Sequence, residues 1–288
     1  MQKFKTPKRG SIDGIIVEAL AEGEKIPIIY LHGLWGTVRQ LRDWMNRSNE
    51  EGHPCYSVEL PGRNGSGPTT SADNISFEEM VEAVEKVLKD VGPAVLVGQG
   101  LGGLIAQAIV DQAPELVTKV VLVASEPPKG IPVRGQVFLR ICRLKPCGKW
   151  FGYIRAICSG KAFEIDKKDI GGFLVKKSEV TPEIEKTFTA ESGLVGWQIA
   201  LGSLSLIKGI PIRDDLSLER PMLVINGEED KAVPIGINKS IADKHGALMV
   251  SYPGSGYMMM LESGWRQPIQ DILTWIEIPE RKSENVFV

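Results

Sequence analysis

Short β-branched segments alternate with longer amphipathic segments along most of the chain. Runs of aliphatic residues predict strands at 14–20, 26–31, 56–60, 94–97, 120–124, 222–225 and 248–252. Apolar residues at helical spacing predict helices at 77–91, 102–112, 234–245 and 264–276. This alternation is typical of βαβ units, so we expect an α/β fold with a mostly parallel central sheet flanked by helices.

The alternation stops between residues 127 and 218, where the strand signals vanish. Residues 129–161 contain eight basic residues and no acidic one, and residues 129–213 contain 15 basic against 7 acidic. This excess of +8 leaves −10 on the rest of the chain, because the total charge is −2. We therefore expect a core made of residues 1–126 and 219–288, with a helical cap inserted at 127–218 over the carboxyl edge of the sheet.

Composition narrows the possible classes of protein. The chain has 288 residues, of which 43% are hydrophobic and 24% charged, as in ordinary globular proteins. Its apolar runs are far shorter than the ~20 residues of a membrane span, and no apolar stretch follows the basic first residues. The four cysteines match no zinc pattern and fit reduced thiols. We expect a cytoplasmic protein with no metal and no cofactor, and the net charge gives no attraction to nucleic acid.

A glycine-rich turn at 96–104, between a predicted strand and a predicted helix, is the sharpest motif. Gly98, Gly100 and Gly103 fit the Gly-x-Gly-x-x-Gly pattern of dinucleotide-binding folds, with Glu126 as the acidic residue. That motif belongs after the first strand of its fold, however, and here it comes near residue 100. The other interpretation is a nucleophile elbow, Gly-x-Ser-x-Gly, with Gly100 at the serine position.

Four further segments decide in favour of the elbow, because the chain then resembles the α/β-hydrolase family over nearly its whole length. Together with the elbow, they resemble capped esterase, lipase and lyase-type members in order and spacing. They are similar to the oxyanion loop (His32-Gly-Leu-Trp-Gly36), the glycine-rich loop after it (60–67), the strand and turn of the triad acid (224–234) and the catalytic histidine loop (253–258).

Two of the three catalytic positions implied by this resemblance are substituted. Gly100 stands at the nucleophile and Tyr257 at the histidine, and only Asp230 matches. The family mechanism needs a hydroxyl that attacks, an imidazole that carries its proton and a carboxylate that orients the imidazole. A phenol with a pKa of ~10 is a poor base at neutral pH. His32 belongs to the oxyanion loop, so it does not replace the missing catalytic histidine, and we expect no ordinary Ser-His-Asp hydrolysis. The candidate catalytic residues are Asp230, Tyr257 and His32.

The anion-binding geometry of the family does not depend on these side chains. The resemblance implies an oxyanion hole made of the backbone N–H groups of Leu34 and Leu101. We expect a carbonyl or carboxylate to bind above Gly100, with extra room where a serine would stand, and Trp35 to form part of the pocket wall. The expected partner is a small, mostly apolar ligand beneath the cap.

Structural explanations compete with these roles. Asp230 could simply accept backbone hydrogen bonds in its turn, and Tyr257 could pack in the core beside the methionine run at 258–260. Glu126 is either a salt-bridge partner of the cap or a functional charge. The basic stretch at 129–161 is either the polar face of amphipathic cap helices or a site for an anionic partner, such as an acyl carrier, a thioester or a membrane surface. Nucleic acid is not expected.

Three functions follow from these residues. In the first, the pocket runs serine-independent chemistry of lyase, isomerase or cyclase type, with an enolate or carboxylate in the oxyanion hole. In the second, the chain is a pseudo-hydrolase that binds a ligand or protein partner without turnover. In the third, it is an esterase-like hydrolase with a non-standard nucleophile or an activated water in the space at Gly100.

Overall fold

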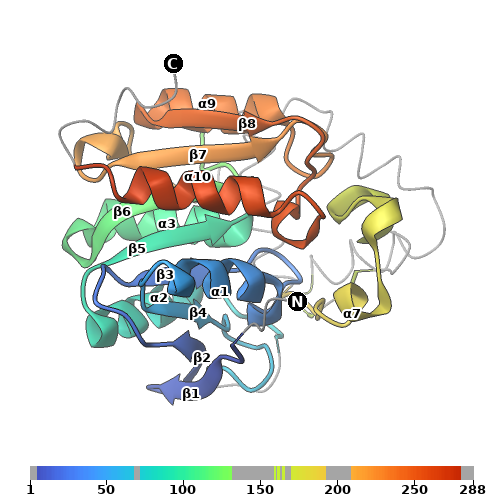
Figure 1. Ribbon diagram of the computed structural model, residues 1–288, viewed down its shortest axis with the longest axis horizontal. Coiled ribbons are helices and arrows are strands. Elements are labelled where there is room, and N and C mark those ends of the chain that lie inside the picture. Colours follow the sequence, from blue (N-terminus) through green and yellow to red (C-terminus); the bar gives the residue numbers. More distant parts are fainter. Residues whose placement is uncertain are drawn as a thin grey trace.

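Figure 1 shows a computed structural model of the chain, in which one twisted sheet is covered by helices on both faces. The structure describes residues 5–67, 72–131, 159, 161–162, 164–165, 170–192 and 209–279. Eight strands form the sheet in the order β1-β2-β4-β3-β5-β6-β7-β8. The strands are β1 (Lys8–Ile12), β2 (Ile15–Leu20), β3 (Ile28–Leu31), β4 (Cys55–Val58), β5 (Ala94–Gln99), β6 (Val117–Val123), β7 (Met222–Gly227) and β8 (Leu248–Tyr252).

Strand direction sets where the loops meet. All neighbours from β4 through β3, β5, β6 and β7 to β8 pair in parallel, whereas β1 and β2 pair antiparallel at one edge. The segments that follow β3, β5, β6, β7 and β8 therefore emerge at the same edge of the sheet. The predicted α/β fold with a mostly parallel sheet is confirmed.

The helices form two layers (Figure 1). Helices α1 (Arg42–Glu50) and α10 (Arg266–Ile276) lie on one face of the sheet, and α2 (Phe77–Val91), α3 (Leu101–Gln112) and α9 (Ile235–His245) cover the other. The sequence explains α2 well. Its start has a capping box between Ser76 and Glu79, and the apolar stripe that predicted the helix is the face it buries.

Two elements were missed by the sequence pattern. Strand β1 is polar and mostly exposed, because it pairs only with β2 at the edge. Its hairpin turn, Asp13-Gly14, has positive φ at both residues (+48° and +80°), as a two-residue type I′ turn requires. Helix α1 is rich in polar residues, yet it buries Trp44 and Met45 against the core.

Residues 127–218 are described only in part. No strand occurs in its described residues, which contain a π-helical turn η3 (Ile170–Leu174), two 3-10 turns, η4 (Lys177–Glu179) and η5 (Leu216–Leu218), and the short helix α7 (Pro182–Glu185). The part from 170 to 192 lies beyond the carboxyl ends of the strands, at the right of Figure 1. The cap boundaries at 127 and 218 stay a prediction.

Candidate active site

Gly100 forms a tight turn between β5 and α3. Its φ of +53° and ψ of −114° are strained for any residue with a side chain. The turn is fixed by backbone hydrogen bonds, because the Gly100 N–H donates to the Val123 carbonyl (3.0 Å) and its own carbonyl accepts from Glu126 N (3.0 Å). The structure thus has, at Gly100, a strained turn between a strand and a helix, as the elbow interpretation predicted.

Tyr257 fills the position of the missing side chain. It follows β8, is 2% exposed, and its hydroxyl lies well inside contact distance of the point where a Cβ on Gly100 would stand. The ring carbon that bears the hydroxyl is 3.1 Å from the same point, and the Gly33 Cα is 3.5 Å away. The expected extra room above Gly100 is therefore absent, because the longer tyrosine side chain reaches across from β8 and occupies it.

The surroundings of Tyr257 keep its hydroxyl protonated. Burial raises the pKa of Tyr257 well above its usual value, and the negative charges of Glu126 and Asp230 raise it further. A side-chain hydrogen bond with Gln99 opposes this shift only in part. At neutral pH the hydroxyl is a hydrogen-bond donor, and a phenolate base is excluded.

Asp230 lies in the turn after β7 and is 5% exposed. Its Oδ1 accepts hydrogen bonds from the backbone N–H groups of Ala232 and Val233, both at 2.8 Å. Its Oδ2 is buried and has no hydrogen-bond partner among the residues that the structure describes. Burial raises the pKa of Asp230 well above the usual range, the two backbone hydrogen bonds lower it, and the charge of Glu126 raises it. Of the two predicted roles, Oδ1 accepts the backbone hydrogen bonds of the turn, and a catalytic role for Asp230 stays a prediction.

Glu126 belongs to the same group. It follows β6, and burial raises the pKa of its carboxyl to about 7. Its negative charge raises the pKa of both Tyr257 and Asp230, and the three residues follow β6, β7 and β8. A carboxyl group that ionises near neutral pH is suited to proton transfer.

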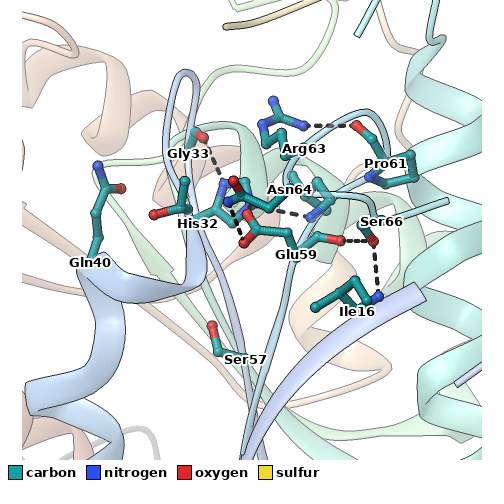
Figure 2. A network of polar contacts seen from close by, with 12 residues as sticks. Ile16, His32, Gly33, Gln40, Ser57, Glu59, Pro61, Arg63, Asn64 and Ser66 are labelled. Atoms are coloured by element: carbon teal, nitrogen blue, oxygen red, sulfur yellow. Dashed lines mark hydrogen bonds and ion pairs between the residues drawn. The ribbon is translucent and has the colours of Figure 1, made fainter. Parts of the chain in front are cut away.

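His32 has contacts at both ring nitrogens (Figure 2). The backbone N–H of Leu60 donates to Nε2 (3.2 Å), so Nδ1 carries the hydrogen and donates to the Gly33 carbonyl (3.0 Å). The Glu59 carboxylate lies 3.5 Å from Nε2. The structure thus places His32 within the network of the loops that follow β3 and β4.

Ser66 also belongs to this network. Its hydroxyl donates to the Glu59 carbonyl (2.5 Å) and accepts from the backbone N–H of Ile16 (3.0 Å), as Figure 2 shows. These two bonds fix the loop that follows β4. They give the serine a structural role in joining this loop to β2.

The backbone donors of the predicted oxyanion hole come from the loops around Gly100. Leu101 is the first residue of α3, so its N–H has no acceptor within the helix. Leu34 follows Gly33, whose Cα approaches the Gly100 turn. The backbone N–H of the next residue, Trp35, donates instead to Glu191 Oε2 (3.2 Å), so the Trp35 N–H is directed away from a ligand.

The structure describes only some of the other predicted features. Cys142, Cys147, Cys158 and the basic residues from 132 to 158 lie outside the described residues, so an anionic partner at this stretch stays a prediction. Among the described residues, no group of three or more His, Cys, Asp and Glu side chains could hold a metal ion. No helix in the described segments has the length and apolar character to cross a membrane.

Comparison with known proteins agrees with this geometry. The alpha/beta hydrolase family matches residues 28–270. A pimeloyl-[acyl-carrier protein] methyl ester esterase of Vibrio parahaemolyticus is 26% identical over 240 residues, which cover 77% of this chain and 83% of the esterase. Epoxide hydrolase 1 of Caenorhabditis elegans is 24% identical over 230 residues, or 74% of this chain, but the match spans only 55% of the worm protein.

Solved structures show the same fold. A monoacylglycerol lipase of Paleococcus ferrophilus superimposes with a TM-score of 0.66 at 16% identity, covering 91% of this chain and 98% of the lipase. A thermophilic esterase of Thermogutta terrifontis gives a TM-score of 0.63 at 18% identity, covering 99% of this chain and all of the esterase. At such identities the likeness concerns the arrangement of the backbone alone.

Proposed function

Since this chain belongs to the alpha/beta hydrolase family, we propose that it uses the oxyanion site of the family for proton-transfer chemistry of lyase or isomerase type, without a covalent intermediate. The observation that carries the proposal is the Tyr257 hydroxyl, which occupies the place of the nucleophile at Gly100. A protonated phenol there is a third donor beside the N–H groups of Leu34 and Leu101. Three hydrogen-bond donors directed at one point stabilise the negative charge that develops on the oxygen of a bound carbonyl group.

Glu126 supplies the base in this mechanism. Its carboxylate takes a proton from the carbon next to a bound carbonyl, the C–H electron pair forms a C=C bond, and the carbonyl π electrons move onto oxygen. The three donors hold the resulting enolate. The proton then returns to another carbon, which gives isomerisation, or a leaving group departs from the next carbon, which gives elimination. Asp230 holds the turn after β7 through its hydrogen bonds from Ala232 and Val233, and His32 positions the loop that carries Leu34.

The test follows exchange of α-protons for deuterium in D₂O by proton NMR, with acetone, cyclohexanone and acetophenone as probes. We expect exchange above the buffer rate, and Tyr257→Phe should lower it about 10²–10⁴-fold, the usual contribution of an acid–base group. Tyr252→Phe is the matched control, because the Tyr252 hydroxyl bonds Asp271 of α10 (3.0 Å) away from the elbow. No exchange with any probe, or equal rates in the two variants, would contradict the proposal.

Non-catalytic binding of a ligand is the second candidate function. The same observation favours it, because Tyr257 occupies the position from which a nucleophile would attack a bound ligand. In that case the ketones should shift the amide NMR signals of Leu34 and Leu101 without exchanging protons. Tyr257→Phe should then leave their affinity within a few-fold. Rapid turnover of p-nitrophenyl acetate by the unmodified chain would instead favour an esterase, the activity for which several relatives are named.

A further inference from the structure

A segment distant in sequence, residues 187–192, runs beside the loop that carries Leu34. The backbone N–H of Thr189 donates to the Trp35 carbonyl (2.8 Å), and the N–H of Trp35 donates to Glu191 Oε2 (3.2 Å). The Thr37 hydroxyl donates to the carbonyl of Thr187 (2.9 Å). Both backbone groups of Trp35 are therefore held by this segment.

Glu191 joins the loop that carries Leu34 to the loop that carries Arg63. Its carboxylate forms an ion pair with Arg63, and both side chains are 0% exposed. The same carboxylate accepts from the backbone N–H of Ser192 through Oε1 (2.9 Å), while Arg63 also donates to the Pro61 carbonyl (3.2 Å). Burying a charged pair is costly unless hydrogen bonds satisfy both groups. The Glu191 carboxylate has such bonds, and one of them goes to the loop beside the elbow.

The conformation of Trp35 explains why that bond matters. Its φ of +54° lies in the left-handed region, which a non-glycine residue occupies only where surrounding contacts hold it. The Trp35 N–H shares a peptide unit with the Leu34 carbonyl, and the Leu34 N–H belongs to the preceding unit, joined to it through the Leu34 Cα. A shift of the Trp35 peptide unit is therefore passed to the Leu34 N–H through the dihedral angles of Leu34. A misplacement of about 1 Å in a binding group can cost about 10²-fold in rate.

We infer that Glu191 is a positioning residue that fixes the Leu34 N–H donor by accepting the Trp35 N–H, so that the carbonyl site is complete only with residues 187–192 in place. This inference rests on the proposed function for its chemistry, because the donor matters only if a carbonyl oxygen binds there. The hydrogen bond itself is independent of that chemistry. The alternative is a purely structural ion pair between Arg63 and Glu191.

Two double variants separate these roles. Arg63→Met/Glu191→Gln and Arg63→Met/Glu191→Met both remove the buried charges, so neither leaves an unpaired ion. The glutamine variant keeps one acceptor oxygen at position 191, whereas the methionine variant of similar size has none. Thermal unfolding of the two should be similar, which establishes that they are equally folded.

The first measurement is hydrogen–deuterium exchange of the Trp35 backbone amide, followed by ¹⁵N NMR without ligand. We expect this amide to stay protected with glutamine and to lose at least about tenfold protection with methionine, together with a change in the Leu34 amide shift. The second is cyclohexanone α-proton exchange. There the methionine variant should lose about 10²-fold in kcat, and the glutamine variant should stay within about tenfold of the unmodified protein.

The outcomes distinguish the two proposals. Equal Trp35 protection and equal Leu34 shifts in the two variants would overturn the role of Glu191, whatever the activity. Lost protection together with an unchanged kcat would also overturn it, because the Leu34 donor would then not depend on the bond. If the unmodified protein exchanges no ketone protons, the proposed function fails, and the amide measurements still decide whether Glu191 holds the loop.

Discussion

Replacing Gly100 by alanine probes the close approach between the elbow and Tyr257. The new methyl group would overlap the Tyr257 hydroxyl at a distance that real Cβ atoms essentially never show. Tyr257 is 2% exposed, so it has no open solvent into which it can turn without leaving the core. We therefore expect Gly100→Ala to fold less stably than the unmodified chain.

Two costs make up the expected loss. A side chain at φ +53° and ψ −114° costs about 1–3 kcal/mol in backbone strain. Overpacking against Tyr257 adds about 1–3 kcal/mol. Together they predict that the free energy of unfolding falls by about 2–6 kcal/mol. This loss is a large part of the total free energy of unfolding of an ordinary domain.

Tyr257→Phe separates the two costs, because it removes the oxygen that the methyl group overlaps. The nearest remaining ring carbon lies 3.1 Å from the Cβ position, a tight contact that a small shift relieves. Gly100→Ala should thus cost less in the Tyr257→Phe background than alone, with a coupling energy of about 1–3 kcal/mol. Urea denaturation of the four proteins measures this cycle.

An additive cycle, with coupling below about 0.5 kcal/mol, would refute the proposed overlap. It would mean that the Tyr257 hydroxyl does not occupy the nucleophile position in solution. The proposed three-donor site would then lose its third donor.

The remaining predictions concern chemistry at the same position. Gly100→Ser/Tyr257→His should gain hydrolysis of p-nitrophenyl acetate, because Asp230 Oδ2 is free to orient an imidazole, whereas Gly100→Ser alone should stay inactive. Ketone exchange by the unmodified chain should rise with pH until it levels above about 7, where Glu126 is ionised, and Glu126→Gln should abolish this rise. The folded state holds the Glu126 proton more tightly than the unfolded state, so stability from this group is present below pH 4.5 and lost as pH rises to about 7. Urea denaturation at about pH 5 and about pH 8 should therefore show Glu126→Gln gaining stability relative to the unmodified chain at the higher pH.

Periodicity was sufficient to predict the sheet and its main helices. Strands β3, β5 and β7 are buried on both faces, so their apolar runs are visible in the sequence. Helix α2 carries its boundary signal in the capping box at Ser76 and Glu79. Strand β1 gave no such signal because it buries little. Its Asp13-Gly14 turn was the available clue.

The candidate site was only partly predictable. Gly100, Asp230 and Tyr257 followed from motif order, because each stands within five residues of the end of a strand. The close approach of the Tyr257 hydroxyl to Gly100 could not be predicted, because the order of motifs in the sequence gives no distances between them. Glu191 lies 156 residues from Trp35 and in no motif, so only the tertiary structure brings its carboxylate to the oxyanion loop.

The long sequence separation between Trp35 and Glu191 also has a consequence for the order of folding. Strands β3 to β6 and their helices can associate through contacts close in sequence, whereas the Trp35 loop must wait for a segment beyond residue 186. Contacts that close such long loops form late and open first under stress. During synthesis, strands β1 to β6 are complete before residues 187–192 have been made, whereas β7 and β8 follow that segment. Mild denaturation of the finished protein should silence the site while the sheet persists.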